Sequence, residues 1–268
     1  MQAVLKDIVA RKFQEVERAR AAVPLEELKE RISELGRPRN FFGALVDRRH
    51  AHQTHIIAEV KRKSPSAGVI REDFDPVAIA KSYAANGASA ISCLTDEVDF
   101  GGHLSYIHMI RDAVKLPVLR KDFLVDIYQV WESRAAGADA ILLIGEVLPE
   151  RDIIDFQILA TELGMTTLLE VHDVYNLLRA VNIVGFPQAS YSLLGINNRD
   201  LRTMKTSLEH SMRLAELLED TSILVSESGI RTPADLARLR AHGIHIALVG
   251  EHLMRQPDPG AALRELLS

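Results

Sequence analysis

Two hydrophobic patterns alternate along this chain from about residue 55 to its end. Short, nearly continuous apolar runs indicate strands that are buried on both faces, as the strands of a parallel sheet are. Between these runs, apolar residues recur at three- and four-residue steps, which predicts amphipathic helices. The predicted strands lie at residues 55–63, 88–96, 117–125, 138–144, 166–171, 192–197, 222–228 and 245–250.

A predicted helix follows each strand, so the chain contains eight strand–helix units. Eight units in 268 residues predict an α/β protein, a closed (β/α)8 (TIM) barrel, with a single domain overall. The alternative is a doubly wound sheet, which usually carries a glycine-rich turn after its first strand. Here that turn reads KSPSAG at residues 63–68, which favours the barrel. We expect the barrel to span residues 51–268.

Helical patterning also precedes the barrel, over about residues 1–36. Pro24 begins a second helix in this segment and Gly36 ends it. Between residues 182 and 191 neither pattern is present, which predicts an extended loop. The apolar stripe of the first N-terminal helix consists of Val4, Ile8, Val9, Phe13, Val16 and Ala19.

The first strand ends in charged residues. With a period of two, the apolar face formed by residues 56, 58 and 60 is buried, and the opposite face carries Glu59, Lys61 and Lys63. Charges within a sheet are costly unless they are paired or face a ligand at its open end. We therefore expect the tip of this strand to deliver three charged groups into a polar pocket. A solvated charge run at a strand end is the alternative reading.

Composition and charge narrow the possible functions. The chain is 47% hydrophobic and 26% charged, which is enough apolar material for a sizeable core, and its net charge of −5 argues against a nucleic-acid partner. No segment resembles a signal peptide or a membrane span, and the single cysteine, Cys93, fits a reducing compartment. The expected protein is cytoplasmic, with neither a nucleic-acid nor a membrane partner.

A small histidine cluster raises the question of a metal site. His50, His52 and His55 match no strong zinc signature, and the neighbouring Arg48 and Arg49 would repel a cation. No metal is expected.

Several other predicted strands also end in ionisable or amide groups. In a barrel, catalytic side chains come from the carboxyl-terminal tips of the strands. Apolar residues gather at the same tips, which suits a ligand with an aromatic part and an anionic part. After the first strand, the polar tip residues are Lys121, Glu170, Asn197, Arg199, Glu227 and Ser228. The apolar ones are Phe100, Phe123, Leu142 and Ile144.

The last two units suggest where an anion binds. Ser228-Gly229 follows the seventh strand, and Gly250 follows the eighth just before a short helix. Glycines there let backbone N–H groups approach a phosphate, and loops after these two strands are the usual phosphate site of this fold. Together with Lys63, they predict a phosphate-binding corner.

Six segments, in order and at the expected strand ends, resemble indole-3-glycerol-phosphate synthase. The resemblance covers about residues 40–256 and implies a metal-free, cofactor-free carbon–carbon lyase of tryptophan biosynthesis. Its substrate would be a phosphorylated small molecule, 1-(2-carboxyphenylamino)-1-deoxyribulose 5-phosphate, and its products indole-3-glycerol phosphate, CO₂ and water. It also implies that residues 1–50 form an extra helical segment packed over the barrel mouth. The segments are AEVKRKSPS (58–66), LRKDF (119–123), LLEV (168–171), GINNRDL (195–201), SESGI (226–230) and VGEHLMR (249–255).

The resemblance also implies roles for individual residues. Lys121 would be the general acid of ring closure and Glu170 would take part in proton transfer during dehydration, with Glu59 and Lys61 lining the same centre. Asn197 would bind the substrate hydroxyls and Arg199 would orient the site. The phosphate residues would be Lys63, Ser64, Ser228, Gly229 and Gly250.

Two expectations concern the charges of this site. Lys61 and Arg199 should lower the pKa of Lys121 and make it a better proton donor. Glu251 lies beside the expected phosphate corner, so its side chain should point away from it.

The resemblance leaves alternatives open. One is another phosphate-binding barrel of the same pathway, such as phosphoribosylanthranilate isomerase, which would be expected to use a cysteine and an aspartate. Another is a non-catalytic barrel that binds a phosphorylated metabolite, but such a protein should have lost a catalytic tip residue. A monomer is the simplest expectation, with an oligomer left open.

Overall fold

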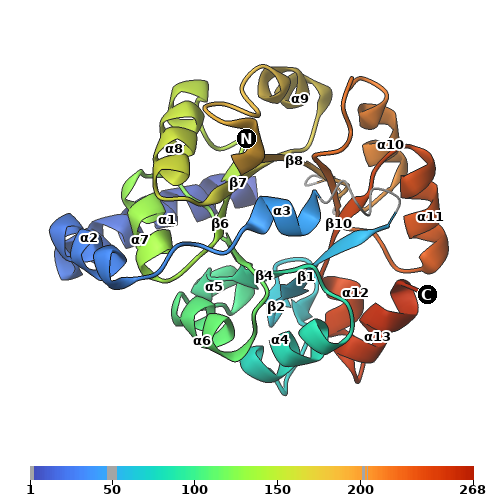
Figure 1. Cartoon of the computed structure of the whole chain (residues 1–268), viewed down its shortest axis with the longest axis horizontal. Coiled ribbons are helices and arrows are strands. Elements are labelled where there is room, and N and C mark those ends of the chain that lie inside the picture. Colours follow the sequence, from blue (N-terminus) through green and yellow to red (C-terminus); the bar gives the residue numbers. More distant parts are fainter. Residues whose placement is uncertain (1–2, 47–52, 201–202, 204) are drawn as a thin grey trace.

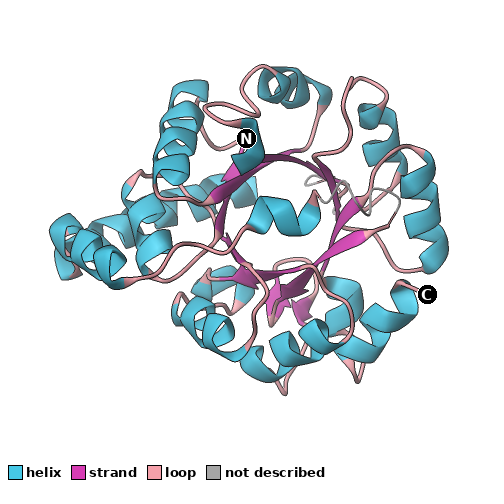
Figure 2. Cartoon of the chain, viewed as in Figure 1, coloured by secondary structure: helices cyan, strands magenta, loops and turns pink. Residues whose placement is uncertain are grey.

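A computed structural model describes residues 3–46, 53–200, 203 and 205–268. Eight parallel strands close into a barrel in the order β1-β10-β9-β8-β7-β6-β5-β4, which confirms the predicted fold class. Figure 2 shows the strands as a ring with helices around it. The strands are β1 (His55–Val60), β4 (Ala90–Leu94), β5 (Val118–Lys121), β6 (Ala140–Ile144), β7 (Thr166–Val171), β8 (Ser192–Asn197), β9 (Leu224–Glu227) and β10 (Ile246–Val249).

Helices follow the strands as the three- and four-residue spacing predicts. Asp75, Asp173 and Thr232 cap three of these helices with side-chain oxygens that accept backbone N–H groups. The helices around the barrel are α4 (Pro76–Ala85), α6 (Ser105–Ala113), α7 (Tyr128–Ala135), α8 (Glu150–Glu162), α9 (Val174–Val181), α10 (Glu209–Ala215), α11 (Pro233–Ala241), α12 (Glu251–Met254) and α13 (Pro259–Leu266). No described helix is both long enough and apolar enough to cross a membrane.

The alternation of side chains divides the core into two layers. Ile57 of β1 belongs to an inner cluster that fills the barrel, together with Leu119, Leu168 and Val225. Odd-numbered positions of β1 therefore face inward, as the sequence predicts. The outer cluster, between strands and helices, receives residues from the opposite face of each strand, including Ile56, Ala58 and Val60 of β1.

Two local elements differ from the prediction. β1 ends at Val60, and a short antiparallel hairpin of β2 (Lys63–Ser64) and β3 (Gly68–Val69) follows it. After β4, where the sequence predicts a longer helix next, the Asp96 side chain accepts the backbone N–H of Asp99 and first begins a short helix, α5 (Glu97–Phe100). The two-residue period does not extend past Val60, because the chain there leaves the barrel sheet.

The loop between α9 and β8 is more ordered than an extended segment. It contains a cis peptide bond between Phe186 and Pro187 and a 3₁₀ turn, η2 (Ala189–Tyr191), that leads into β8.

The N-terminal segment is divided between both ends of the barrel rather than lying wholly over the mouth. Its helices are α1 (Ala3–Ala22), α2 (Leu25–Glu34) and α3 (Phe41–Leu45). α1 reaches the carboxyl-terminal end of the strands and α2 packs on α7, whereas α3 lies across the barrel axis and contacts η2, just before β8 (Figure 1). Phe41 and Leu45 are fully buried in the inner cluster, so α3 closes the end of the barrel opposite the mouth.

Phe13 of the predicted first-helix stripe points to solvent. The side chain of Phe13 is 52% exposed, whereas Lys12 is only 3% exposed. The buried line of α1 runs through Leu5, Ile8, Lys12 and Val16, at three- and four-residue steps. A lysine in such a line signals a buried partner of opposite charge.

Candidate active site

A cavity of about 460 Å³ opens at the carboxyl-terminal tips of the strands. The structure brings together all six predicted catalytic residues along its wall. It also gathers Ser64, Ser228, Gly229 and Gly250 of the predicted phosphate corner, and the four predicted apolar residues. The catalytic candidates are Glu59, Lys61, Lys121, Glu170, Asn197 and Arg199, and the apolar ones are Phe100, Phe123, Leu142 and Ile144.

Lys63 is the predicted site residue that does not line this cavity. It belongs to the hairpin that follows β1, and its side chain packs beside Gly101 at the end of α5. The prediction placed it on one face with Glu59 and Lys61 by extending the strand alternation. That alternation ends with β1 at Val60, so Lys63 takes a different direction.

Two lysines paired with carboxyl groups occupy the centre of the cavity. Lys121 Nζ lies 2.5 Å from Glu170 Oε2 and 3.2 Å from Glu227 Oε2, so one ammonium group joins the tips of β5, β7 and β9. Lys61 donates a hydrogen bond to Glu59. These four side chains and Glu227 are all buried or nearly so.

Two glycines make room for these carboxylates. A Cβ on Gly195 of β8 would overlap the carboxylate of Glu227, and a Cβ on Gly250 would overlap that of Glu59. Gly250 thus has a steric role at the ionic centre in addition to its place in the predicted phosphate corner.

The carboxylates raise the pKa of Lys121, so the expected lowering is wrong. Burial by itself would lower this pKa, but the charges of Glu170, Glu227 and Glu59 outweigh it. The cations that were expected to act on Lys121 are bound elsewhere: Lys61 pairs with Glu59, and Arg199 Nη2 lies 3.1 Å from Glu251. Lys121 is therefore a charged ammonium group at neutral pH.

The two carboxyl groups beside Lys121, those of Glu170 and Glu227, have pKa values shifted in opposite directions. Burial would raise the pKa of Glu170, but the charges of Lys121 and His172 lower it to about 2. Burial and the neighbouring Glu170 carboxylate raise the pKa of Glu227 well above its ordinary value. Glu170 is therefore the more acidic of the two carboxyl groups, and Glu227 holds a proton more readily. The sequence identified Glu227 only as a strand tip and assigned it no role.

The predicted phosphate corner has an unusual backbone. Ser228 and Gly229 both have positive φ, 70° and 83°, so the chain turns sharply after β9. The backbone N–H groups of Gly229, Ile230 and Gly250 make no hydrogen bond within the described part of the chain. Neighbouring N–H groups in such a turn form a concavity suited to an anion.

Glu251 faces the cavity instead of pointing away from it. Its carboxylate binds Arg199 on one side and Arg255, at 2.9 Å, on the other, and these contacts lower its pKa. Two guanidinium groups therefore offset the negative charge that would otherwise oppose a phosphate.

The apolar half of the cavity lies near α1 and α5. Phe100 and Phe123 have ring centroids 6.0 Å apart, at an angle of 41°. Leu5 and Ile8 of α1 line the same cavity with them. The site thus combines an apolar wall with an ionic centre, as the sequence predicts.

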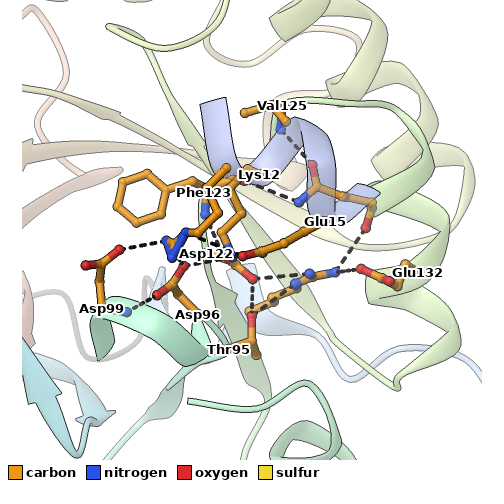
Figure 3. Close-up of polar contacts among 12 residues, drawn as sticks. Lys12, Glu15, Thr95, Asp96, Asp99, Asp122, Phe123, Val125 and Glu132 are labelled. Atoms are coloured by element: carbon orange, nitrogen blue, oxygen red, sulfur yellow. Dashed lines mark hydrogen bonds and ion pairs between the residues drawn. The ribbon is translucent and has the colours of Figure 1, made fainter. Parts of the chain in front are cut away.

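Behind the apolar half, a buried network joins α1 to the strand tips (Figure 3). Lys12 Nζ lies 2.8 Å from both Asp96 and Asp122 and 2.9 Å from Glu15. Asp122 directly follows Lys121, and its second oxygen accepts the hydroxyl of Thr95 at 2.5 Å. The sequence does not predict this network, although a lysine in the buried line of α1 is a signal for it.

The described residues contain no group of three or more His, Cys, Asp or Glu side chains arranged to hold a metal ion. Of the histidine cluster, His50 and His52 lie outside the described residues. His55 Nδ1 lies 3.3 Å from Ser89 Oγ at the start of the barrel strands, away from the mouth.

Comparisons with known proteins agree with the geometry. Residues 5–266 match the family model "Indole-3-glycerol phosphate synthase". A relative of that name from Rhodopirellula baltica is 49% identical over 265 residues, with 99% of each chain covered. Another from Laribacter hongkongensis is 46% identical over 269 residues, with all of both chains covered.

Solved structures support the fold alone. A 3-hexulose-6-phosphate synthase superimposes with a TM-score of 0.62 at 16% identity, covering 80% of this chain and 98% of the other. A thiamine phosphate pyrophosphorylase from Pyrococcus furiosus gives a TM-score of 0.55 at 15% identity, covering 81% of this chain and 95% of the other.

The Lys12 network leads to a prediction about stability. Lys12→Met removes the ammonium group that Asp96 and Asp122 share in the interior. Asp96 keeps Arg11 and Asp122 keeps Arg120, so the unfolding free energy should fall by the contribution of charge-assisted hydrogen bonds, about 1.5–3 kcal/mol. Urea unfolding should show this loss, while Lys6→Met, at an exposed position of the same helix, should leave the midpoint unchanged. The pKa of Asp122 is about 2, so its contribution should persist above pH 4 and disappear as the pH falls toward 2. Equal midpoints for the two variants would contradict the prediction.

Proposed function

Because this chain belongs to the indole-3-glycerol phosphate synthase family, we propose that Lys121 and Glu170 are the central acid and base of its reaction. The protein is a carboxy-lyase of tryptophan biosynthesis. It converts 1-(2-carboxyphenylamino)-1-deoxyribulose 5-phosphate to indole-3-glycerol phosphate, CO₂ and water. The observation that carries the proposal is the 2.5 Å pairing of Lys121 with Glu170 inside a cavity that both apolar and ionic side chains line.

Ring closure requires a proton donor at the ketone. The ring carbon that bears the carboxylate attacks the keto carbon, a C–C bond forms, and the carbonyl π electrons move to oxygen. Lys121 donates a proton to that oxygen. Its raised pKa keeps the ammonium group protonated in the free enzyme, and a developing alkoxide is more basic than an amine, so the transfer is favourable.

Decarboxylation and dehydration then complete the indole. The C–CO₂ bond breaks and its electrons return to the ring system. The former keto oxygen, now a hydroxyl group, leaves as water after a second protonation, while Glu170 removes a proton from the adjacent carbon to form the double bond. Its low pKa keeps Glu170 ionised and ready to accept that proton.

The remaining residues position the substrate. Asn197 Nδ2 lies 3.3 Å from Glu170 Oε1 and can bind a substrate hydroxyl from the same place. Glu59 and Lys61 line the centre opposite Glu170, and Arg199 orients that side through Glu251. The aryl ring would lie against Phe100, Phe123, Leu142 and Ile144, and the phosphate in the corner of Ser64, Ser228, Gly229 and Gly250.

The direct test is turnover and its dependence on Lys121. Purified protein given the carboxyphenylamino substrate in EDTA should produce indole fluorescence. Lys121→Ala should lower kcat by about 10²–10⁴-fold, while Lys115→Ala, at an exposed position before β5, should keep the wild-type rate. No fluorescence from the wild type would favour a non-catalytic binding barrel. A Lys121→Ala variant with a tenth of the wild-type kcat would remove Lys121 from the acid role.

The phosphate corner should affect binding more than chemistry. Gly229→Ala places a Cβ 3.2 Å from Thr206 at a positive φ, which should disturb the N–H groups beside it and raise KM. Gly164→Ala is a matched control, because its φ is +75° and its nearest neighbour, Pro38, lies 3.3 Å away outside the cavity.

Titration with indole-3-glycerol phosphate separates the two effects. Gly229→Ala should weaken product binding by tenfold or more, since a charge-assisted contact contributes about 1.5–3 kcal/mol. Glu170→Gln should bind product and lower kcat. If Gly229→Ala binds product like Gly164→Ala, the phosphate is held elsewhere.

A further inference from the structure

His172, which has no role in the proposed reaction, lies beside Glu170, the proposed base. His172 directly follows β7, two residues after Glu170, and its side chain is 11% exposed and lines the cavity. Glu170 lines the same cavity. His172 Nε2 lies 3.5 Å from Glu170 Oε1 and makes no hydrogen bond within the described residues.

Glu146 holds this imidazole from the other side. Glu146 follows β6, and its Oε1 accepts the backbone N–H of His172 at 2.8 Å. Its other oxygen lies 3.2 Å from His172 Nδ1. A carboxylate only accepts hydrogen bonds, so Nδ1 carries the proton whatever the charge of the ring.

The proton on Nδ1 leaves two states for Nε2. If the ring is neutral, Nε2 presents a lone pair to the carboxylate of Glu170, and the two repel. If the ring is an imidazolium, Nε2 presents an N–H group and the contact becomes attractive. With a carboxylate on each side, the charged ring is favoured.

Other charged groups around His172 leave this balance in place. Lys121 of β5 opposes the charge, but it is itself paired with Glu170. His210 of α10 contacts the His172 carbonyl rather than the ring, at 2.9 Å, and the carboxylate of Asp173 caps α9. The net effect is a raised pKa for His172, because Glu146 and Glu170 outweigh burial and Lys121.

We propose that His172 is a positioning residue, held by Glu146 as an imidazolium, that fixes Glu170 in the direction needed for proton removal. The inference rests on the proposed role of Glu170 as the base. Glu170 Oε2 is bound to Lys121, so the contact of Oε1 with His172 and Asn197 determines how the carboxylate is rotated. Loss of the Nε2 proton would turn one of these contacts repulsive.

The pH profile of single-turnover rates tests this arrangement. The rate should fall as the pH rises through the pKa of His172, because the imidazolium is present below that pKa and lost above it. Glu146→Gln removes a charge that raises this pKa, so the same decline should move to lower pH by about one unit or more. His172→Gln should lower the rate by about 10²-fold, as misplacement of a catalytic group does, and abolish that decline.

Controls separate positioning from folding. His108→Gln changes an exposed histidine that lies 3.3 Å from Asp112, far from the cavity, and should leave the profile unchanged. Indole-3-glycerol phosphate should bind all three variants as it binds the wild type. In the double variant Glu146→Gln/His172→Gln, the rate and profile should equal those of His172→Gln alone. The proposal would be overturned if the decline in rate occurred at the wild-type pH in Glu146→Gln. It would also be overturned if His172→Gln still showed that decline.

A second readout does not depend on activity. Nitrogen NMR of the wild type, assigned by comparison with His172→Gln, should show both ring nitrogens of His172 protonated at pH 7. A neutral ring there would overturn the proposal even if Glu170 is the base. Full activity of Glu170→Gln, in contrast, would contradict the proposed function and leave the measured charge of His172 standing.

Discussion

The active centre depends on burying one ammonium group among carboxyl groups from separate strands. Lys121 lies 2.5 Å from Glu170 and 3.2 Å from Glu227, and all three side chains are removed from water. Buried ions are costly unless their partners are well placed. One lysine also cannot neutralise two carboxylates, so the pKa of Glu227 is raised while that of Glu170 is lowered. The cluster thus separates the pKa values of two chemically equal groups in opposite directions.

Strand pairing in the barrel fixes the relative positions of these charged side chains. Parallel pairing fixes β7, β8 and β9 side by side, with Glu170 opposite Gly195 and Asn197 opposite Glu227. Gly195 leaves space for the Glu227 carboxylate, where a Cβ would overlap it. At the other end of the barrel, α3 fills the interior with Phe41 and Leu45. Apolar packing therefore stabilises the end of the barrel opposite the mouth, and the charged groups lie at the mouth.

Much of the fold and of the site follows from local sequence patterns. Apolar runs locate the strands, and alternation correctly directs Ile57 and Glu59 inward, because both features depend on a few adjacent residues.

Lys63 shows the limit of such patterns: the period of two holds only within a strand, and β1 ends at Val60. The pKa of Lys121 shows a second limit of local patterns. Whether this pKa is raised or lowered depends on which strand tips meet across the barrel. Lys12, Asp96 and Asp122 meet only after α1 docks, although a lysine in the buried line of a helix is a readable signal.

The pairing of the proposed acid with the proposed base has a consequence for substrate binding. In the free enzyme Lys121 and Glu170 satisfy each other, so a ketone that receives the proton of Lys121 has to compete with a carboxylate 2.5 Å away. Binding energy from remote groups of a substrate can offset such a cost. The phosphate corner at Ser228 and Gly229 follows β9 and Phe123 of the apolar wall follows β5, so separate strands carry them to the same cavity. A substrate held at both ends would be drawn across Lys121, and its keto oxygen would replace Glu170 as the partner of the ammonium group. Glu170 would then be released as a base at the step that needs one.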